Sequence, residues 1–153
     1  MTLTLPDGPI TLKNASVPAC LLGQEGGLIR MDISVANGVL TDAPGSPVEL
    51  GGAMVLPCFV DMHTHLDKGH IWPRKPNPDG SFMGALTSVG EDRAAHWSAD
   101  DVQRRMDFAL RCAFFHGTRA VRTHLDSIPP QAEISFPVFR EMREEWEGRI
   151  ACG

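Results

Sequence analysis

The stretch AMVLPCFVDMHTHLD, from Ala53 to Asp67, decides which fold the sequence predicts. It opens with an apolar run that does not alternate with polar residues, and polar side chains gather only at its C-terminal end. A run of this kind is typical of a strand that is buried on both faces, as in parallel sheets. In α/β folds, ligands bind just beyond the carboxyl ends of such strands. We therefore expect a buried parallel strand whose polar end faces a functional site.

The residues that follow this stretch alternate between helix and strand patterns. Residues 73–90 are rich in proline, glycine and asparagine and are predicted to form a loop. Residues 98–117 are predicted to form a helix, followed by a strand over 118–126 and a helix over about 135–147. RIACG, at 149–153, has the pattern of a third strand. This order implies an α/β fold with parallel pairing.

The helix over 98–117 has the clearest pattern in the chain. Ser98 can cap its first turn, and Gly117 follows its last turn. Its apolar side chains fall on one stripe, which consists of Val102, Met106, Ala109 and Ala113 with Leu110 and Phe114 beside it. This stripe is the predicted core face of the helix.

The residues before the decisive stretch have a different character. Residues 10–17, 28–35 and 38–43 are predicted to be short strands, and Asn37-Gly38 is a strong hairpin signal. We expect a small antiparallel β unit over residues 1–56 and a separate α/β unit over residues 57–153.

Composition excludes several classes of protein. With 42% hydrophobic and 22% charged residues, the chain can bury a core and is not predicted to be disordered. A net charge of −5, without a cluster of lysine and arginine longer than a pair, argues against binding to nucleic acid. The longest nearly unbroken apolar run, Ala53 to Val60, is too short to cross a membrane. Four scattered cysteines without a C-x-x-C pair, and no secretion signal, favour a reduced, cytoplasmic protein.

His63 and His65 form an H-x-H pair at the end of the decisive strand. Residues i and i+2 of a strand point to the same side, so both imidazoles can reach one zinc or iron ion. The alternative is a strand whose polar end simply meets water, and H-x-H alone is a weak signal. His124 and Asp126 repeat the HLD pattern after the next strand, so they are expected to face the same mouth. His124 is equally compatible with a purely structural role at a strand end.

Taken together, AMVLPCFVDMHTHLDKGH and the segment ending in VRTHLD resemble the amidohydrolase superfamily of metal-dependent hydrolases, in particular its cytosine deaminase-like branch. The resemblance runs from about residue 30 to the last residue. It implies the N-terminal part of a (β/α)₈ TIM-type barrel, about two and a half βα units, preceded by a small β-sandwich segment. Cys58 departs from the family pattern, which usually has glycine there.

This resemblance also implies a reaction and a set of site residues. His63 and His65 would be the first two ligands of one divalent metal ion, zinc or iron. Asp67, His124 and Asp126 would contact a small-molecule substrate or support the ligands from behind. The reaction would be hydrolysis of a non-peptide C–N bond, as in the deamination of a cyclic amidine or aminopyrimidine-like substrate.

The family takes its remaining ligands and its proton-shuttling glutamate from later strands, which these residues do not contain. A full barrel needs ~250 residues, so the chain is expected to be an N-terminal fragment that is inactive alone and contributes no catalytic residue. A partial barrel has open strand edges and uncovered helix faces, which favour association with another copy of the chain into a homo-oligomer. Two alternatives stay open: a cyclic amide hydrolase of the dihydroorotase or hydantoinase kind, and a non-catalytic or degenerate α/β binding module.

Overall fold

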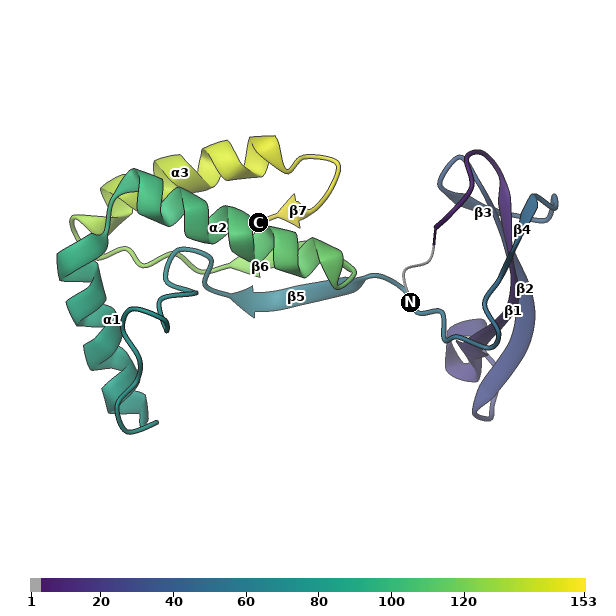
Figure 1. Cartoon of the computed structure of the whole chain (residues 1–153), viewed down its shortest axis with the longest axis horizontal. Coiled ribbons are helices and arrows are strands. Elements are labelled where there is room, and N and C mark those ends of the chain that lie inside the picture. The colour runs from purple at the N-terminus through teal and green to yellow at the C-terminus, as the bar shows by residue number, and fades with distance from the viewer. Residues whose placement is uncertain (1–3) are drawn as a thin grey trace. The chain divides into compact units, whose positions relative to one another are not determined.

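The computed structural model describes residues 4–153, and the chain divides into two compact units, Met1–Pro57 and Cys58–Gly153. In the first unit, four strands form one sheet in the order β3-β2-β1-β4 (Figure 1). Their bounds are β1 Ile10–Pro18, β2 Leu28–Ala36, β3 Val39–Thr41 and β4 Ser46–Glu49, and a short 3₁₀ helix, η1, covers Ala19–Leu22. The three predicted strands and the hairpin at Asn37-Gly38 are confirmed, and both turn residues have positive φ.

The expectation of a purely antiparallel unit is wrong, because β4 pairs in parallel with β1. This strand is only four residues long and contains Pro47, so it has almost no strand signature in the sequence. Gly45 allows its approach: a Cβ there would lie 2.3 Å from the carbonyl carbon of Pro9, so a side chain would clash with backbone. The close approach of residue 45 to the Pro9 backbone, which brings β4 beside β1, therefore requires glycine.

The second unit is an α/β layer in which three parallel strands pair in the order β5-β6-β7. The helices α2 and α3 lie side by side over one face of this sheet (Figure 1). The elements follow one another as β5 Phe59–Thr64, α1 Phe82–His96, α2 Ala99–Phe115, β6 Thr118–Thr123, α3 Gln131–Glu145 and β7 Ala151–Cys152. The predicted order of strand, helix, strand, helix, strand is confirmed, with one additional helix.

That additional helix, α1, occupies part of the segment predicted to be a loop. The Ser81 hydroxyl caps it by accepting a hydrogen bond of 2.9 Å from the N–H of Gly84. The side chains that α1 buries are polar, namely Ser88 and Asp92, so the helix lacks an apolar stripe that a sequence pattern would reveal. Similarly, α3 begins four residues before the predicted Ser135, because its first turn also buries a polar side chain, Gln131.

The core of the second unit is built on the stripe predicted for α2. Val102, Met106 and Leu110 have no exposed surface, whereas Phe114 is 42% exposed and lies at the margin. Around them pack buried side chains of the turn after β5, of β6, of α3, of the segment that joins α3 to β7, and of β7: Leu66, Val121, Val138, Met142, Trp146, Ile150 and Cys152. Burial of this apolar surface is the main force that holds the helices on the sheet.

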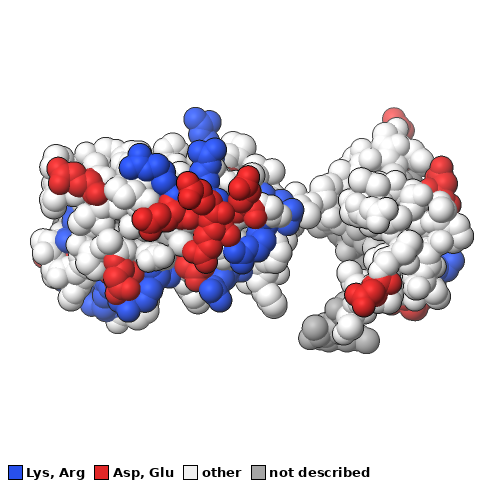
Figure 2. Space-filling view, turned by 90° about the horizontal axis from the view of Figure 1, so that it is seen from above, with Lys and Arg blue, Asp and Glu red and all other residues white. Residues whose placement is uncertain are grey.

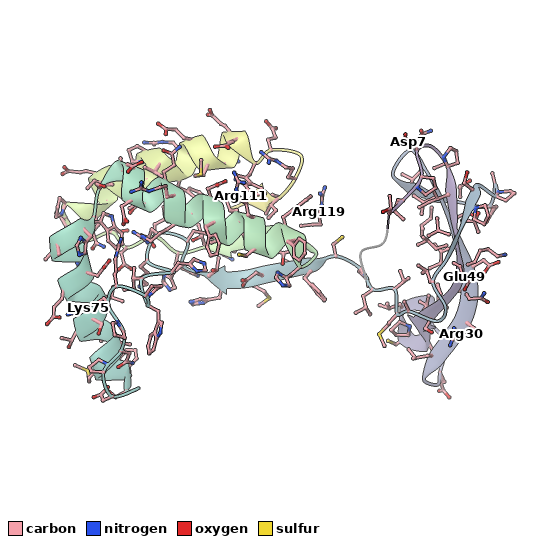
Figure 3. The ribbon with its side chains drawn as sticks, viewed as in Figure 1. Asp7, Arg30, Glu49, Lys75, Arg111 and Arg119 are labelled. Carbon is pink, nitrogen blue, oxygen red and sulfur yellow. The ribbon has the colours of Figure 1, made fainter. Side chains whose placement is uncertain are left out.

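The outer surface of the helices is charged. Arg104 pairs with Asp100 at 2.8 Å, and Arg111, which projects from α2 in Figure 3, pairs with Asp107 at 2.6 Å. On the face seen in Figure 2, acidic side chains gather in the middle of this unit with lysines and arginines around them. Exposed ion pairs of this kind contribute little to stability. The apolar core therefore provides most of the stability of this unit.

The expectation that the decisive strand is buried on both faces is wrong in this structure. Phe59, Val60 and Met62 are 54%, 67% and 75% exposed. β5 is the edge of a three-stranded sheet, and the described helices of its unit cover only one face. The first half of the apolar run belongs instead to the first unit, where Val55 donates to the Ser16 carbonyl at 2.9 Å. Among residues 4–153, no helix has both the length and the apolar character that a membrane crossing requires.

Truncation of the central core leucine, Leu110→Ala, is expected to lower the free energy of unfolding of the second unit by about 2–5 kcal/mol, because it leaves a cavity in a fully buried site. All three tryptophans lie in this unit, so urea denaturation followed by tryptophan fluorescence reports on it alone. The control is Phe115→Ala on the same helix, where the side chain is 85% exposed and a change below about 0.5 kcal/mol is expected. Equal losses in both variants would contradict this account of the core.

Candidate functional site

The carboxyl ends of β5 and β6 meet at one edge of the sheet and bring three histidines together. His63 is the second-last residue of β5, His65 follows that strand directly, and His124 directly follows β6. The N–H of His124 donates to the Thr64 carbonyl at 2.8 Å, which holds the two strand ends in register. Parallel pairing thus places side chains from two distant segments at the same mouth.

The three imidazole rings form a cluster. Their centroids are 5.4 Å apart for His63 and His65, 4.4 Å for His63 and His124, and 5.6 Å for His65 and His124. An ion about 2.0–2.1 Å from a ring nitrogen would lie roughly 3.2 Å from the centroid, so two rings on one ion would have centroids about 4.5–5.5 Å apart. The spacing of His63 and His65, 5.4 Å, lies within this range, and the spacings of 4.4 Å and 5.6 Å to His124 lie just outside it. Within residues 4–153, however, no three His, Cys, Asp or Glu side chains are arranged to hold a metal ion. The cluster supplies neighbouring imidazoles rather than a complete ligand set.

His65 has the properties of a neutral imidazole. Burial is the main cause that lowers its pKa, and the positive charge of Lys68 adds to this effect. Its Nδ1 atom is buried and has no hydrogen-bond partner among the described residues. Neutral imidazole is the form that binds zinc and iron. The ring therefore fits the chemistry of a metal ligand.

Asp67 lies behind the histidines and joins the two strand ends. Its side chain is fully buried, and Oδ2 accepts a hydrogen bond of 2.8 Å from the N–H of Asp126. Burial is the main cause that raises the pKa of this carboxyl group. Because this carboxyl group is hydrogen-bonded to the backbone, it is better placed to hold the two strand ends together than to contact a substrate.

Asp126 and Lys68 form an ion pair at the same mouth, with Lys68 Nζ 2.7 Å from Asp126 Oδ1. Both side chains are partly exposed, at 26% for the lysine and 18% for the aspartate. Arg93 of α1 lies 3.9 Å from the other carboxylate oxygen of Asp126. Sequence reasoning named Asp126 but gave Lys68 no role, although the lysine belongs to the HLDK motif.

A network of arginines and aspartates anchors the loop between β5 and α1 to the helices. Arg74 donates to Asp92 of α1 at 2.6 and 2.9 Å and to Asp101 of α2 at 2.5 and 2.9 Å. Arg105 donates to the same Asp101 at 2.9 Å. These arginines were missed by sequence reasoning. The signal that could have identified Arg105 is its place between Val102 and Met106, on the apolar stripe of α2.

The comparisons with known proteins agree with this geometry. No protein-family model matches the chain. It is 56% identical to a pterin deaminase of Rhizobium rhizogenes (strain K84) over an alignment of 153 positions, which covers 92% of this chain but 35% of that protein. The chain therefore spans about one third of the length of this curated relative.

Two solved structures have a similar fold. The 5-methylcytosine deaminase of Klebsiella pneumoniae is 19% identical with a TM-score of 0.67, over 94% of this chain and 35% of that one. The N-isopropylammelide isopropylaminohydrolase of Burkholderia multivorans is 25% identical with a TM-score of 0.66, over 95% and 36% of the two chains. These findings confirm the predicted resemblance to the N-terminal part of the amidohydrolase superfamily, and they confirm the α/β fold.

Protonation of Asp101 is expected to destabilise the second unit in acid. Hydrogen bonds from Arg74, and then from Arg105, lower the pKa of this carboxyl group to about 2. In the unfolded chain the pKa of an aspartate is about 3.9. The ionised Asp101 carboxylate therefore contributes on the order of 2 kcal/mol to the free energy of unfolding. This contribution is fully present above about pH 4 and is lost as the pH falls towards 2. Asp101→Asn should lower stability at pH 7 and flatten the slope of stability against pH between about 4.5 and 2.5.

The measurement is urea denaturation at a series of pH values, followed by tryptophan fluorescence. Asp100→Asn is the matched control, because Asp100 is the neighbouring residue of α2 and its carboxylate pairs with the exposed Arg104. This control should retain the wild-type slope. If Asp101→Asn kept the wild-type slope of stability against pH, the role assigned to the hydrogen bonds of Asp101 with Arg74 and Arg105 would be contradicted.

Proposed function

We propose that this chain is the N-terminal part of a metal-dependent hydrolytic deaminase that acts on a cyclic amidine or aminopyrimidine-like small molecule. The observation that carries the proposal is the cluster of His63, His65 and His124 at the shared end of two parallel strands, in a chain 56% identical to part of a pterin deaminase. In this proposal, β5, β6 and β7 are the first strands of a (β/α)₈ barrel, and residues 1–56 are the N-terminal β-sandwich segment.

The proposed ligands from this chain are His63 and His65, which would hold one divalent ion, either zinc or iron. The unpartnered, buried Nδ1 of His65 and the lowered pKa of its ring support this assignment. When bound, such an ion supplies an activated water at neutral pH. Catalytic zinc sites have three or more protein ligands, so the set would need further groups beyond this pair.

The overall reaction would consume one water and release one ammonia. The water oxygen forms a bond to the ring carbon that bears the amino group, and the C–N bond breaks. The amino nitrogen takes one proton from the water and leaves as ammonia, while the other proton stays on the ring of the oxo product. In this chain, His124 lies 4.4 Å from His63 between ring centroids and would contact the substrate or the ligands. Asp67 would keep the two strand ends together, and the ion pair of Lys68 and Asp126 would border the mouth.

A non-catalytic α/β binding module is the second candidate function, because within residues 4–153 the His, Cys, Asp and Glu side chains do not provide a complete set of three metal ligands. The two functions differ in a property that can be measured on this chain directly, namely its affinity for a divalent ion.

The chain is expected to bind one equivalent of Zn²⁺ or Co²⁺ through its histidine cluster. His63→Ala and His65→Ala should each weaken that binding by more than about tenfold, because each removes one imidazole ligand. Isothermal titration calorimetry measures the affinity, and the visible absorption of Co²⁺ reports nitrogen ligation. His96→Ala, at the exposed end of α1, is the control and should bind like the wild type. A folded chain without measurable binding would favour the non-catalytic module.

The activity itself is testable in a chimera. Residues 1–153 would replace the matching third of the Rhizobium rhizogenes pterin deaminase, whose remaining two thirds supply the rest of the protein. We expect release of ammonia from pterin, detected by a coupled assay, and a loss of at least about 100-fold in His65→Ala. A folded, metal-loaded chimera that releases no ammonia from pterin or from aminopyrimidines would refute the proposed reaction.

A further inference from the structure

Arg105 is a buried cation that lies directly behind the turn following His65. Its side chain belongs to α2 and is only 8% exposed. One guanidinium nitrogen, Nη1, donates to two backbone carbonyl oxygens of that turn, those of Asp67 and Gly69, the second at 3.2 Å. Burying a charge of this kind is costly unless it is fully paired. The interaction therefore calls for an explanation beyond stability.

The turn that Arg105 holds is tight. Residues 66–68 reverse the chain after β5, and a Cβ at Gly69 would lie 3.4 Å from the His65 carbonyl oxygen. The carbonyl oxygens of Asp67 and Gly69 both accept hydrogen bonds from Nη1 of Arg105 on α2. Buried carbonyl oxygens need a donor, and Arg105 supplies one to the turn.

Arg105 is itself held rigidly from two sides. Its Nε donates to Asp101 at 2.9 Å, and the guanidinium group lies 5.1 Å from the centroid of the Trp97 ring. Asp101 in turn is bonded to Arg74, which also binds Asp92 of α1. The turn is thus connected through Arg105, Asp101 and Arg74 to both α1 and α2.

The turn transmits this position to the histidines. Leu66, next to His65, donates its N–H to Thr123 Oγ1 at 3.0 Å, beside His124. Asp67 accepts the N–H of Asp126 at 2.8 Å, on the other side of His124. A shift of the turn would therefore move His65 relative to both His63 and His124.

We infer that Arg105 is a positioning residue, which sets the orientation of the His65 imidazole and thereby the affinity of the histidine cluster for a divalent ion. This inference rests on the proposed function, because it assigns a role to a metal site. The guanidinium group suits the role since its fork reaches a carboxylate and two carbonyl groups at once, whereas a lysine ammonium group cannot span them.

The neighbouring arginine provides a matched control. Arg104 and Arg105 each pair with the aspartate four residues earlier, at 2.8 and 2.9 Å, but the Arg104 side chain is 72% exposed, whereas that of Arg105 is 8% exposed and contacts the turn. Arg104→Met therefore removes the same kind of ion pair from the same helix. Arg105→Met removes the contacts with the turn as well, and Arg105→Lys keeps the charge while it loses the fork.

Co²⁺ is titrated into each folded variant of the 153-residue chain. We expect the dissociation constant to rise at least about tenfold in Arg105→Met and about threefold or more in Arg105→Lys, as for residues that orient metal ligands from behind. In Arg104→Met the dissociation constant should stay within about twofold. Should Arg105→Met fail to fold, Arg105→Lys decides the matter. Unchanged affinity in the folded lysine variant, or an equal loss in Arg104→Met, would overturn the inference.

A second readout needs no metal. Amide hydrogen exchange at Leu66 and Asp126, measured by NMR, should accelerate at least about tenfold in Arg105→Lys, since both amides bond across the turn. The Ser16 amide, which donates to Ala53 in the first unit, is the internal reference and should not change. Wild-type exchange rates in the lysine variant would overturn the inference on their own. If exchange accelerates while even the wild type binds no Co²⁺, then the proposed metal site is refuted together with the role of Arg105 in it, although Arg105 still holds the turn.

Discussion

The parallel register between β5 and β6 is the constraint on which the candidate site depends. One backbone hydrogen bond, from His124 to the Thr64 carbonyl, aligns the ends of two strands that are about sixty residues apart in the chain. Because the alignment is parallel, the polar ends of both strands lie at the same edge, and three imidazole rings come within 5.6 Å of one another. A shift of one residue would turn the His63 side chain to the opposite face of the sheet.

The same edge is stabilised by polar groups rather than by apolar packing. Asp67 is fully buried and bonds to the backbone of the neighbouring strand end, while Arg105 satisfies two carbonyl groups of the turn from behind. Asp67 Oδ1 and Arg105 Nη2 are buried without a hydrogen-bond partner among the described residues, so this network is only partly satisfied. Its hydrogen bonds still connect the turn to the end of β6 and to α2.

The predictions from sequence were most successful where an apolar pattern reports burial. The stripe of α2 was identified because Val102, Met106 and Leu110 recur at helical spacing, and these side chains have no exposed surface. The helix α1 was mistaken for a loop because its buried side chains, Ser88 and Asp92, are polar. The strand β5 was expected to be covered on both faces, yet Val60 and Met62 are exposed, since a residue pattern records a tendency towards burial and not the presence of a covering layer.

The sequence by itself determined the order of the α/β elements apart from α1, the core stripe and the place of His63 and His65 at one strand end, because these depend on short-range spacing. The repeated HLD pattern also predicted that His124 faces the same mouth. Only the tertiary structure decided how close its ring lies to the other two, that Asp67 is bonded to backbone, and that Arg105 bonds to the turn. These three features are contacts between residues from 36 to more than 50 positions apart in the chain. Only strand pairing and helix packing bring such residues together, and local sequence spacing carries no record of either.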